Sequence, residues 1–154
     1  MIESHPHLVF EAHSTDYQNP QAYHELIRDH FAILKVGPAL TFAVREALFA
    51  LDAAEKEWIG VHQASHLRDT IEQVMHEQPN YWRSHYQSKG HQQFLDCNYS
   101  LSDRIRYYWT HPEVQTAQQA LFEHLIEKPL PTTLLSQYLP NQARAIAQQH
   151  IANH

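Results

Sequence analysis

Two short apolar runs near the start of the chain have the pattern of buried β-strands. Residues 8–12 (LVFEA) and 31–37 (FAILKVG) are each bounded by polar or turn-forming residues. Between them, Asn19 and Pro20 have the residue types of a helix N-cap and first helical position. Strand, helix and strand together occupy about 30 residues, which is the length of a parallel βαβ unit.

The remainder of the chain has helical periodicity. A long helix from Pro38 to Trp58 has two apolar stripes, which predicts that it packs against two partners, the sheet and the elements after Trp58. Two shorter helical pieces close the chain after residue 128. Three further helices are predicted between them from their apolar positions: Leu67, Ile71, Val74 and Met75; Leu101, Ile105 and Tyr108; and Val114, Leu121 and Leu125, in a helix that begins at Pro112.

The position of the strands predicts an incomplete sheet. Parallel strands are covered on both faces, and a pair of them has two open edges. We therefore predict an α/β fold in which residues 1–58 form the last two βα units of a TIM (β/α)8 barrel and residues 59–154 form an all-helical C-terminal extension. A complete barrel needs roughly 200 residues or more, so this chain supplies about two of its eight strands.

The charge balance argues against two classes of partner. The chain of 154 residues has 17 acidic and 11 Lys or Arg side chains, a formal charge of −6. Nucleic acids and anionic membranes both bind basic surfaces, so we expect neither as a partner. No segment reaches the roughly 18 uninterrupted apolar residues of a membrane span.

A single cysteine, Cys97, excludes an intramolecular disulfide and a zinc site built on several thiolates. The first residues, MIESHPHL, lack the basic and apolar regions of a signal peptide. These two observations lead us to expect a cytoplasmic protein.

Charged side chains alternate with apolar ones at the ends of both predicted strands. Glu11 and His13 share one face of the first strand, and Lys35 and Gly37 share one face of the second. In a barrel, Glu11 and Lys35 would point into the interior near the carboxyl ends of the strands, where barrel enzymes place their catalytic groups. A buried carboxylate and ammonium must be paired, so we predict that the two interact. A structural ion pair and a ligand-binding role both remain open.

The loops that follow these strands carry further polar candidates. His13 and Asp16 could hold a metal only with help from other strands, and a strand-end histidine beside an Asp/Ser turn explains them as well. We assign no metal site to this chain. Gly37 leads into the long helix, whose N-terminal amides could receive a phosphate.

The segment Asn98–Trp109 (NYSLSDRIRYYW) is the densest motif. Ser100 and Asp103 have the spacing of a capping box at a helix start. Four side chains of this segment form a candidate protein interface, with packing as the alternative: Arg104, Arg106, Tyr107 and Tyr108. The chain contains no GxxxxGK[ST] loop and no GxSxG elbow.

Four blocks, in order, resemble the non-catalytic subunit family of class II tagatose-1,6-bisphosphate aldolase. The blocks are residues 9–18 (VFEAHSTDYQ), 28–51 (RDHFAILKVGPALTFAVREALFAL), 99–109 (YSLSDRIRYYW) and 136–140 (SQYLP). The resemblance runs along nearly the whole chain, which corresponds to less than half of such a subunit, from a late barrel strand into a shortened helical region.

The resemblance implies an accessory role. Such subunits give a separate, zinc-dependent catalytic subunit its full activity and stability, in a chaperone-like manner, and serve the breakdown of galactitol or N-acetylgalactosamine through tagatose 6-phosphate. It implies no cofactor and no catalytic residue in this chain. Five residues remain as a candidate sugar-phosphate pocket: Glu11, His13, Asp16, Lys35 and Gly37.

Two alternatives to the accessory subunit stay open. The strand-end residues would suit a TIM-barrel enzyme acting on a phosphorylated ketose, and some family members carry an older label as tagatose-6-phosphate kinases. The chain could also be a remnant of a longer protein without a function of its own.

Overall fold

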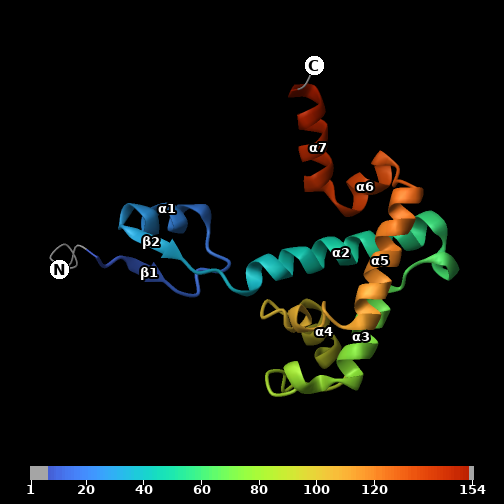
Figure 1. Ribbon diagram of the computed structural model, residues 1–154, viewed down its shortest axis with the longest axis horizontal. Coiled ribbons are helices and arrows are strands. Elements are labelled where there is room, and N and C mark those ends of the chain that lie inside the picture. The colour runs from blue at the N-terminus through green and yellow to red at the C-terminus, as the bar shows by residue number, and fades with distance from the viewer. Residues whose placement is uncertain (1–6, 153–154) are drawn as a thin grey trace.

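The computed structural model describes residues 7–152, and Figure 1 shows their arrangement. The architecture is mixed α/β, mostly helical, with one small parallel sheet. The strands and α-helices are β1 (Phe10–Ala12), α1 (Pro20–Arg28), β2 (Phe31–Leu34), α2 (Pro38–Ile59), α3 (Leu67–Glu77), α4 (His91–Tyr99), α5 (Pro112–Glu127), α6 (Thr132–Tyr138) and α7 (Pro140–Ala152). Three 3-10 turns lie between helices: η2 (Val61–Gln63), η3 (Pro79–Tyr81) and η4 (Arg104–Tyr107).

The first 34 residues include the predicted βαβ unit. Strands β1 and β2 pair in parallel, with Glu11 opposite Ile33 and Ala12 opposite Leu34. Asn19 caps α1 as predicted, because its side chain accepts a hydrogen bond from the Ala22 amide at 2.8 Å. Both strands are shorter than their apolar runs, because β1 begins only at Phe10 and β2 ends at Leu34. Within residues 7–152 the sheet has no third strand.

The apolar surface of the βαβ unit is largely uncovered. The prediction of strands buried on both faces is wrong for this chain, because β1 and β2 have only each other and α1 beside them. Large apolar side chains of the unit are 42–62 % exposed: Leu8, Val9, Phe10, Ile27, Ile33 and Val36. A parallel pair in this state lacks the neighbours that cover such sheets in other proteins.

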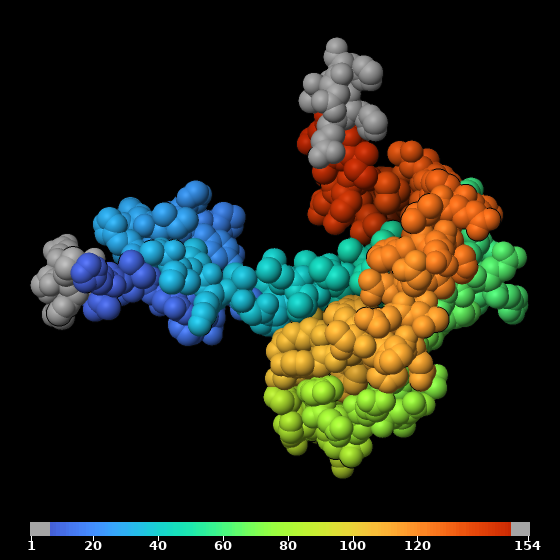
Figure 2. All heavy atoms as spheres, viewed as in Figure 1, coloured from blue at the N-terminus to red at the C-terminus, as the bar shows by residue number. Residues whose placement is uncertain are grey.

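Helix α2 connects the βαβ unit to the helical body, which we define as the part of the structure after residue 45. Its C-terminal half is buried in that body, where Leu48 and Phe49 are 6 % and 9 % exposed. Its N-terminal half is not covered by the sheet as predicted, since Leu40 and Val44 are 65 % and 52 % exposed. Figure 2 shows the βαβ unit as a separate lobe that joins the helical body through α2.

The core of the helical body lies where α3 crosses α5 against α2. The predicted apolar positions of α3, which are Leu67, Ile71, Val74 and Met75, are all buried, and so are Val114 and Leu121 of α5. Fully burying one such side chain is worth about 1.5–3 kcal/mol. The stripes read from the sequence therefore identify the packing surface of both helices.

The segment around Leu101 departs from the prediction of a helix through Leu101, Ile105 and Tyr108. The helix there, α4, ends at Tyr99, and residues 104–107 form only the 3-10 turn η4. Asp103 takes a left-handed backbone conformation, with φ at 44°, which a helix interior does not allow. Ser100 accepts a hydrogen bond from the Ser102 amide instead of capping an α-helix. The capping-box pattern was therefore a local turn.

We expect Leu121→Ala to lower the free energy of unfolding by about 2–5 kcal/mol, because it opens a cavity where α5 meets α3. Ile126→Ala on the same helix is the matched control, since Ile126 is 78 % exposed, and it should change stability by no more than about 0.5 kcal/mol. Urea denaturation followed by circular dichroism at 222 nm measures both. Equal effects of the two substitutions would contradict this packing.

Candidate functional site

The predicted contact between Glu11 and Lys35 is present at the ends of the two strands. Lys35 Nζ lies 2.7 Å from Glu11 Oε1, and His13 Nε2 lies 3.0 Å from the same oxygen. Lys35 follows β2 directly, and its amide donates to the Ala12 carbonyl at 2.9 Å, which holds its side chain beside β1. One carboxylate therefore engages both basic side chains of the strand ends.

This ion pair is exposed, which corrects the prediction that it is buried. The side chains of Glu11 and Lys35 are 31 % and 59 % exposed, because no further strand encloses them in the described chain. The hydrogen bond from Lys35, with a smaller contribution from the charge of His13, lowers the pKa of Glu11 below its ordinary value. Glu11 is thus an ionised carboxylate at neutral pH.

Asp16 and Gly37 form a second, separate contact. Asp16 Oδ1 accepts hydrogen bonds from the amides of Gly37 and Ala39, at 2.7 and 3.0 Å, and Oδ2 lies 2.9 Å from the Gly37 amide. A Cβ at Gly37 would lie 3.2 Å from Asp16 Oδ2, so glycine permits this close approach. The N-terminus of α2, where the sequence suggested a phosphate, is occupied by a carboxylate of the chain itself.

The five residues predicted for a sugar-phosphate pocket do not share one cavity. A hollow of about 400 Å³ lies between the end of β1 and α1, and of the five only His13 lines it. Thr15, Gln18 and Glu25 also line this hollow. In this chain the candidate residues form two polar contacts, and the hollow opens beside the first of them.

Tyr17 links the strand-end loop to the helical body, a role that sequence reasoning missed. Its hydroxyl donates to the Leu101 carbonyl at 2.7 Å, and its ring lies edge-on to Phe42 with centroids 5.8 Å apart. Residues 17 and 101 are 84 positions apart, so no local pattern could indicate the contact. This bond brings the segment after α4 beside the start of α2.

The predicted interface residues divide into exposed and buried groups. Arg106 donates from Nη1 to the Ser102 carbonyl and from Nη2 to the Tyr107 hydroxyl, the latter at 3.0 Å. Tyr107 is 42 % exposed. Tyr108 is only 2 % exposed and donates to the Gln78 carbonyl at 2.6 Å, so the structure removes it from the predicted interface and places it in the core.

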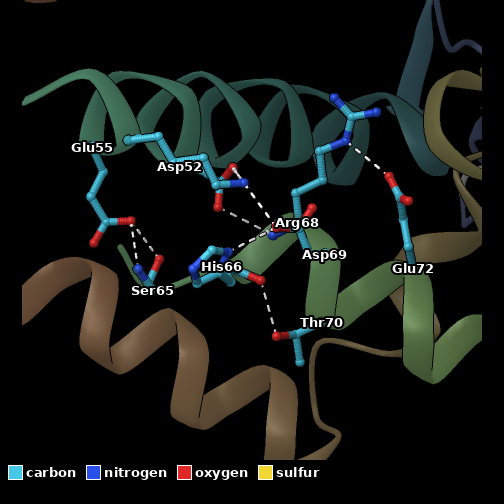
Figure 3. Close-up of polar contacts among 9 residues, drawn as sticks. Asp52, Glu55, Ser65, His66, Arg68, Asp69, Thr70 and Glu72 are labelled. Carbon is cyan, nitrogen blue, oxygen red and sulfur yellow. Dashed lines mark hydrogen bonds and ion pairs between the residues drawn. The ribbon is translucent and has the colours of Figure 1, made fainter. Parts of the chain in front are cut away.

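A buried carboxylate, Glu55, organises the turn between α2 and α3, as Figure 3 shows. Its Oε2 accepts from the Ser65 amide and hydroxyl at 3.0 and 2.6 Å, and its Oε1 lies 2.6 Å from His124 Nδ1 of α5. Ser65 donates to the carboxylate and not to a histidine, so this arrangement does not activate a nucleophile. The feature of the sequence that could have indicated this buried contact is the position of Glu55 on an apolar stripe of α2.

A second polar cluster closes the same turn (Figure 3). Lys56 Nζ lies 2.8 Å from Asp52 and 3.1 Å from Asp69, and His66 Nδ1 lies 3.0 Å from Asp69. Although burial alone would raise the pKa of Asp69, hydrogen bonds from His66 and Lys56 lower it. Gly60, with φ at 87°, provides the backbone conformation that ends α2. The cluster therefore stabilises the helix connection.

Within residues 7–152, no three His, Cys, Asp or Glu side chains gather as a group that could hold a metal ion. Over the same residues, no helix is long and apolar enough to cross a membrane.

Comparison with known proteins identifies the family. The model of the D-tagatose-1,6-bisphosphate aldolase subunit GatZ/KbaZ-like family matches residues 1–154. The chain belongs to this family. The resemblance seen in the four sequence blocks is thereby confirmed, and the match to the tagatose-bisphosphate aldolase subunit family extends over the whole length of the chain.

A solved structure is similar to this family member. It is described as a "probable tagatose 6 phosphate kinase" from Sinorhizobium meliloti 1021, is 44 % identical to the chain and superposes with a TM-score of 0.86. The match covers 92 % of the chain and 36 % of the S. meliloti protein. The chain thus spans about a third of the length of this relative.

We expect Asp16→Ala to lower the free energy of unfolding by about 1 kcal/mol, the usual cost of losing an N-cap side chain. Amide hydrogen exchange at Gly37 and Ala39 should become faster, because both amides lose their acceptor. Asp29→Ala is the matched control, since Asp29 is exposed and its nearest cation, Arg28, lies 3.5 Å away. Unchanged exchange at both amides would refute the capping role.

Lys35→Met should raise the pKa of Glu11 toward its ordinary value, because the hydrogen bond that lowers it is lost. A ¹³C NMR titration of the Glu11 carboxyl measures this. In the unaltered chain, the pair stabilises the fold fully above the ordinary carboxyl pKa of 4.5 and loses its effect as the pH falls through the lower pKa of folded Glu11. Arg28→Met, whose guanidinium faces Asp29, should leave the Glu11 titration unchanged.

Proposed function

We propose that this family member acts as a non-catalytic accessory subunit of class II D-tagatose-1,6-bisphosphate aldolase. It binds the separate catalytic subunit and increases its activity and stability, in a chaperone-like manner, during the cytoplasmic breakdown of tagatose 6-phosphate. The observation that carries the proposal is the family match over residues 1–154. The zinc of a class II aldolase would belong to the catalytic partner.

The polar side chains at the strand ends support an accessory role. Glu11 binds Lys35 and His13, and Asp16 caps α2, so these carboxylates hold structure together. Catalysis by a general acid or base requires such a group within reach of a substrate proton. Of this set, His13 lines the hollow beside α1, whereas Glu11, Asp16 and Lys35 do not.

We propose further that residues 1–58 are the last two βα units of a TIM barrel and that residues 59–154 are its helical extension. The parallel pair β1 and β2 is open at both edges in the described chain, and apolar residues of the βαβ unit, such as Val9 and Ile33, are exposed. More than half of the S. meliloti relative lies outside the match, which covers 36 % of that protein. Additional βα units would cover this surface and enclose Glu11 and Lys35.

An enzyme that acts on a phosphorylated ketose is the second candidate. The observation that favours it is the cluster of Glu11, His13 and Lys35 at the carboxyl ends of parallel strands, where barrel enzymes place reactive groups. Turnover of tagatose 6-phosphate or tagatose 1,6-bisphosphate by the purified chain, abolished by Lys35→Ala, would establish this function in place of the accessory role.

Adding the chain to the catalytic aldolase subunit should raise both its aldolase activity and its thermal midpoint. Binding to the folded state stabilises by about 2.7 kcal/mol when the ligand is at 100 times its dissociation constant. Activity measured by tagatose 1,6-bisphosphate cleavage and melting measured by differential scanning fluorimetry provide the two readouts. An unrelated protein at the same concentration is the control, and no change in either readout would refute the accessory role.

A further inference from the structure

Two neighbouring, half-buried arginines of η4 lack the carboxylate partner that Arg28, Arg45 and Arg68 have; Arg83 and Arg144 also form no ion pair in the described chain, but both are exposed. Arg28, Arg45 and Arg68 each lie within 3.5 Å of an Asp or Glu oxygen. Among the described residues, Arg104 and Arg106 form no ion pair, although both are half-buried. The Nε of Arg104 is buried and has no hydrogen-bond partner there. A half-buried guanidinium without an anion is an incomplete electrostatic arrangement.

The guanidinium of Arg106 is held in a fixed position. Its Nη1 donates to the Ser102 carbonyl, its Nη2 donates to the Tyr107 hydroxyl at 3.0 Å, and its Cζ lies 4.7 Å from the centroid of the Tyr107 ring. These contacts leave other N–H groups of the planar guanidinium available. A donor that is already oriented loses little conformational entropy when it binds an acceptor.

An aromatic platform adjoins the two arginines. The rings of Tyr81 and Tyr107 are stacked, with centroids 5.2 Å apart and planes inclined by 20°, and Arg104 Cζ lies 5.7 Å from the Tyr107 centroid. Both tyrosines are exposed, at 49 % and 42 %. We name the four side chains Tyr81, Arg104, Arg106 and Tyr107 the arginine–tyrosine surface. Tyrosine and arginine are the residues that contribute most often to the central contacts of protein interfaces.

The charge of this surface is opposite to that of the chain. The chain as a whole has a formal charge of −6, whereas the arginine–tyrosine surface carries two positive charges. The nearest carboxylate in sequence, Asp103, is buried and faces Arg45, with Arg45 Nε 3.5 Å from its Oδ1. It therefore does not neutralise Arg104 or Arg106.

We propose that the arginine–tyrosine surface binds the carboxylates of an acidic segment of a protein partner. Two adjacent guanidiniums can each form paired hydrogen bonds with a carboxylate, and the tyrosine rings supply the apolar contact area beside them. The choice of partner rests on the accessory function proposed above: the acidic segment belongs to the catalytic aldolase subunit. A protein segment fits better than a small anion because the charged groups lie beside an exposed aromatic face.

The direct test uses fluorescein-labelled octaglutamate and fluorescence anisotropy at low ionic strength. The unaltered chain should bind the peptide, and Arg104→Gln/Arg106→Gln should weaken binding at least about tenfold. Lys128→Gln/Arg144→Gln is the matched control: it removes the same charge from the distal end of α5 and from α7, away from η4 (Figure 1). Thermal melting confirms that each variant is folded.

Equal weakening by the two double variants would overturn the proposal, because the peptide would then be responding to net charge alone. Inorganic phosphate that shifts the Nε–Hε NMR signals of Arg104 and Arg106, together with no response to octaglutamate, would also overturn it by showing a small-anion site. The control variant retaining the affinity of the unaltered chain supports it.

A second arm separates this inference from the accessory function. Arg104→Gln/Arg106→Gln should lose the ability to raise the thermal midpoint of the catalytic subunit, while Lys128→Gln/Arg144→Gln keeps it. If both variants raise the midpoint equally, the accessory function stands and the surface is not its docking site. If the unaltered chain fails to raise it while octaglutamate binding depends on Arg104 and Arg106, the accessory function fails and the carboxylate-binding surface stands.

Discussion

The packing of α2 against the helical body is the interaction on which the rest of the structure depends. The helix begins at the strand ends, where Asp16 binds its first amides, and it ends at the turn that Glu55 holds through Ser65. Its C-terminal half is buried by α3, α5 and α6, while Leu40 and Val44 of its N-terminal half are exposed. One helix thus positions the βαβ unit, and Tyr17 adds a single hydrogen bond across the same junction.

A two-stranded parallel sheet cannot cover its own faces, and this constraint shapes the functional interpretation. Apolar residues of β1, β2 and the start of α2 are exposed, and the S. meliloti relative has a much longer chain. Such a surface is suited to contact with more polypeptide, either additional βα units or another subunit. The same constraint explains why Glu11 and Lys35 meet as expected and yet remain open to solvent.

Most carboxylates of the described chain that could carry chemistry are already engaged in holding its parts together. Glu11 binds Lys35, Asp16 caps α2, Glu55 joins α2 to α5 through His124, and Asp103 faces Arg45. These carboxylates therefore serve the folding of the described chain. The arginines of η4 are different, since neither has an anionic partner among the described residues, although hydrogen bonds hold Arg106 in place.

The amino-acid sequence by itself determined the parallel βαβ unit, the N-cap at Asn19, the buried stripes of α3 and α5, and the contact between Glu11 and Lys35. These features depend on residue periodicity and on short-range chemistry, which a sequence contains directly. Only the tertiary structure decided that Asp16 occupies the N-terminus of α2, where the sequence suggested a phosphate. It also decided that Tyr108 is buried and that α4 ends before Asp103. Each of these depends on groups distant in sequence. Asp16 meets Gly37 because β1 pairs with β2, whereas Gln78 reaches Tyr108, and Arg45 reaches Asp103, only when α2 and the helices after it pack together.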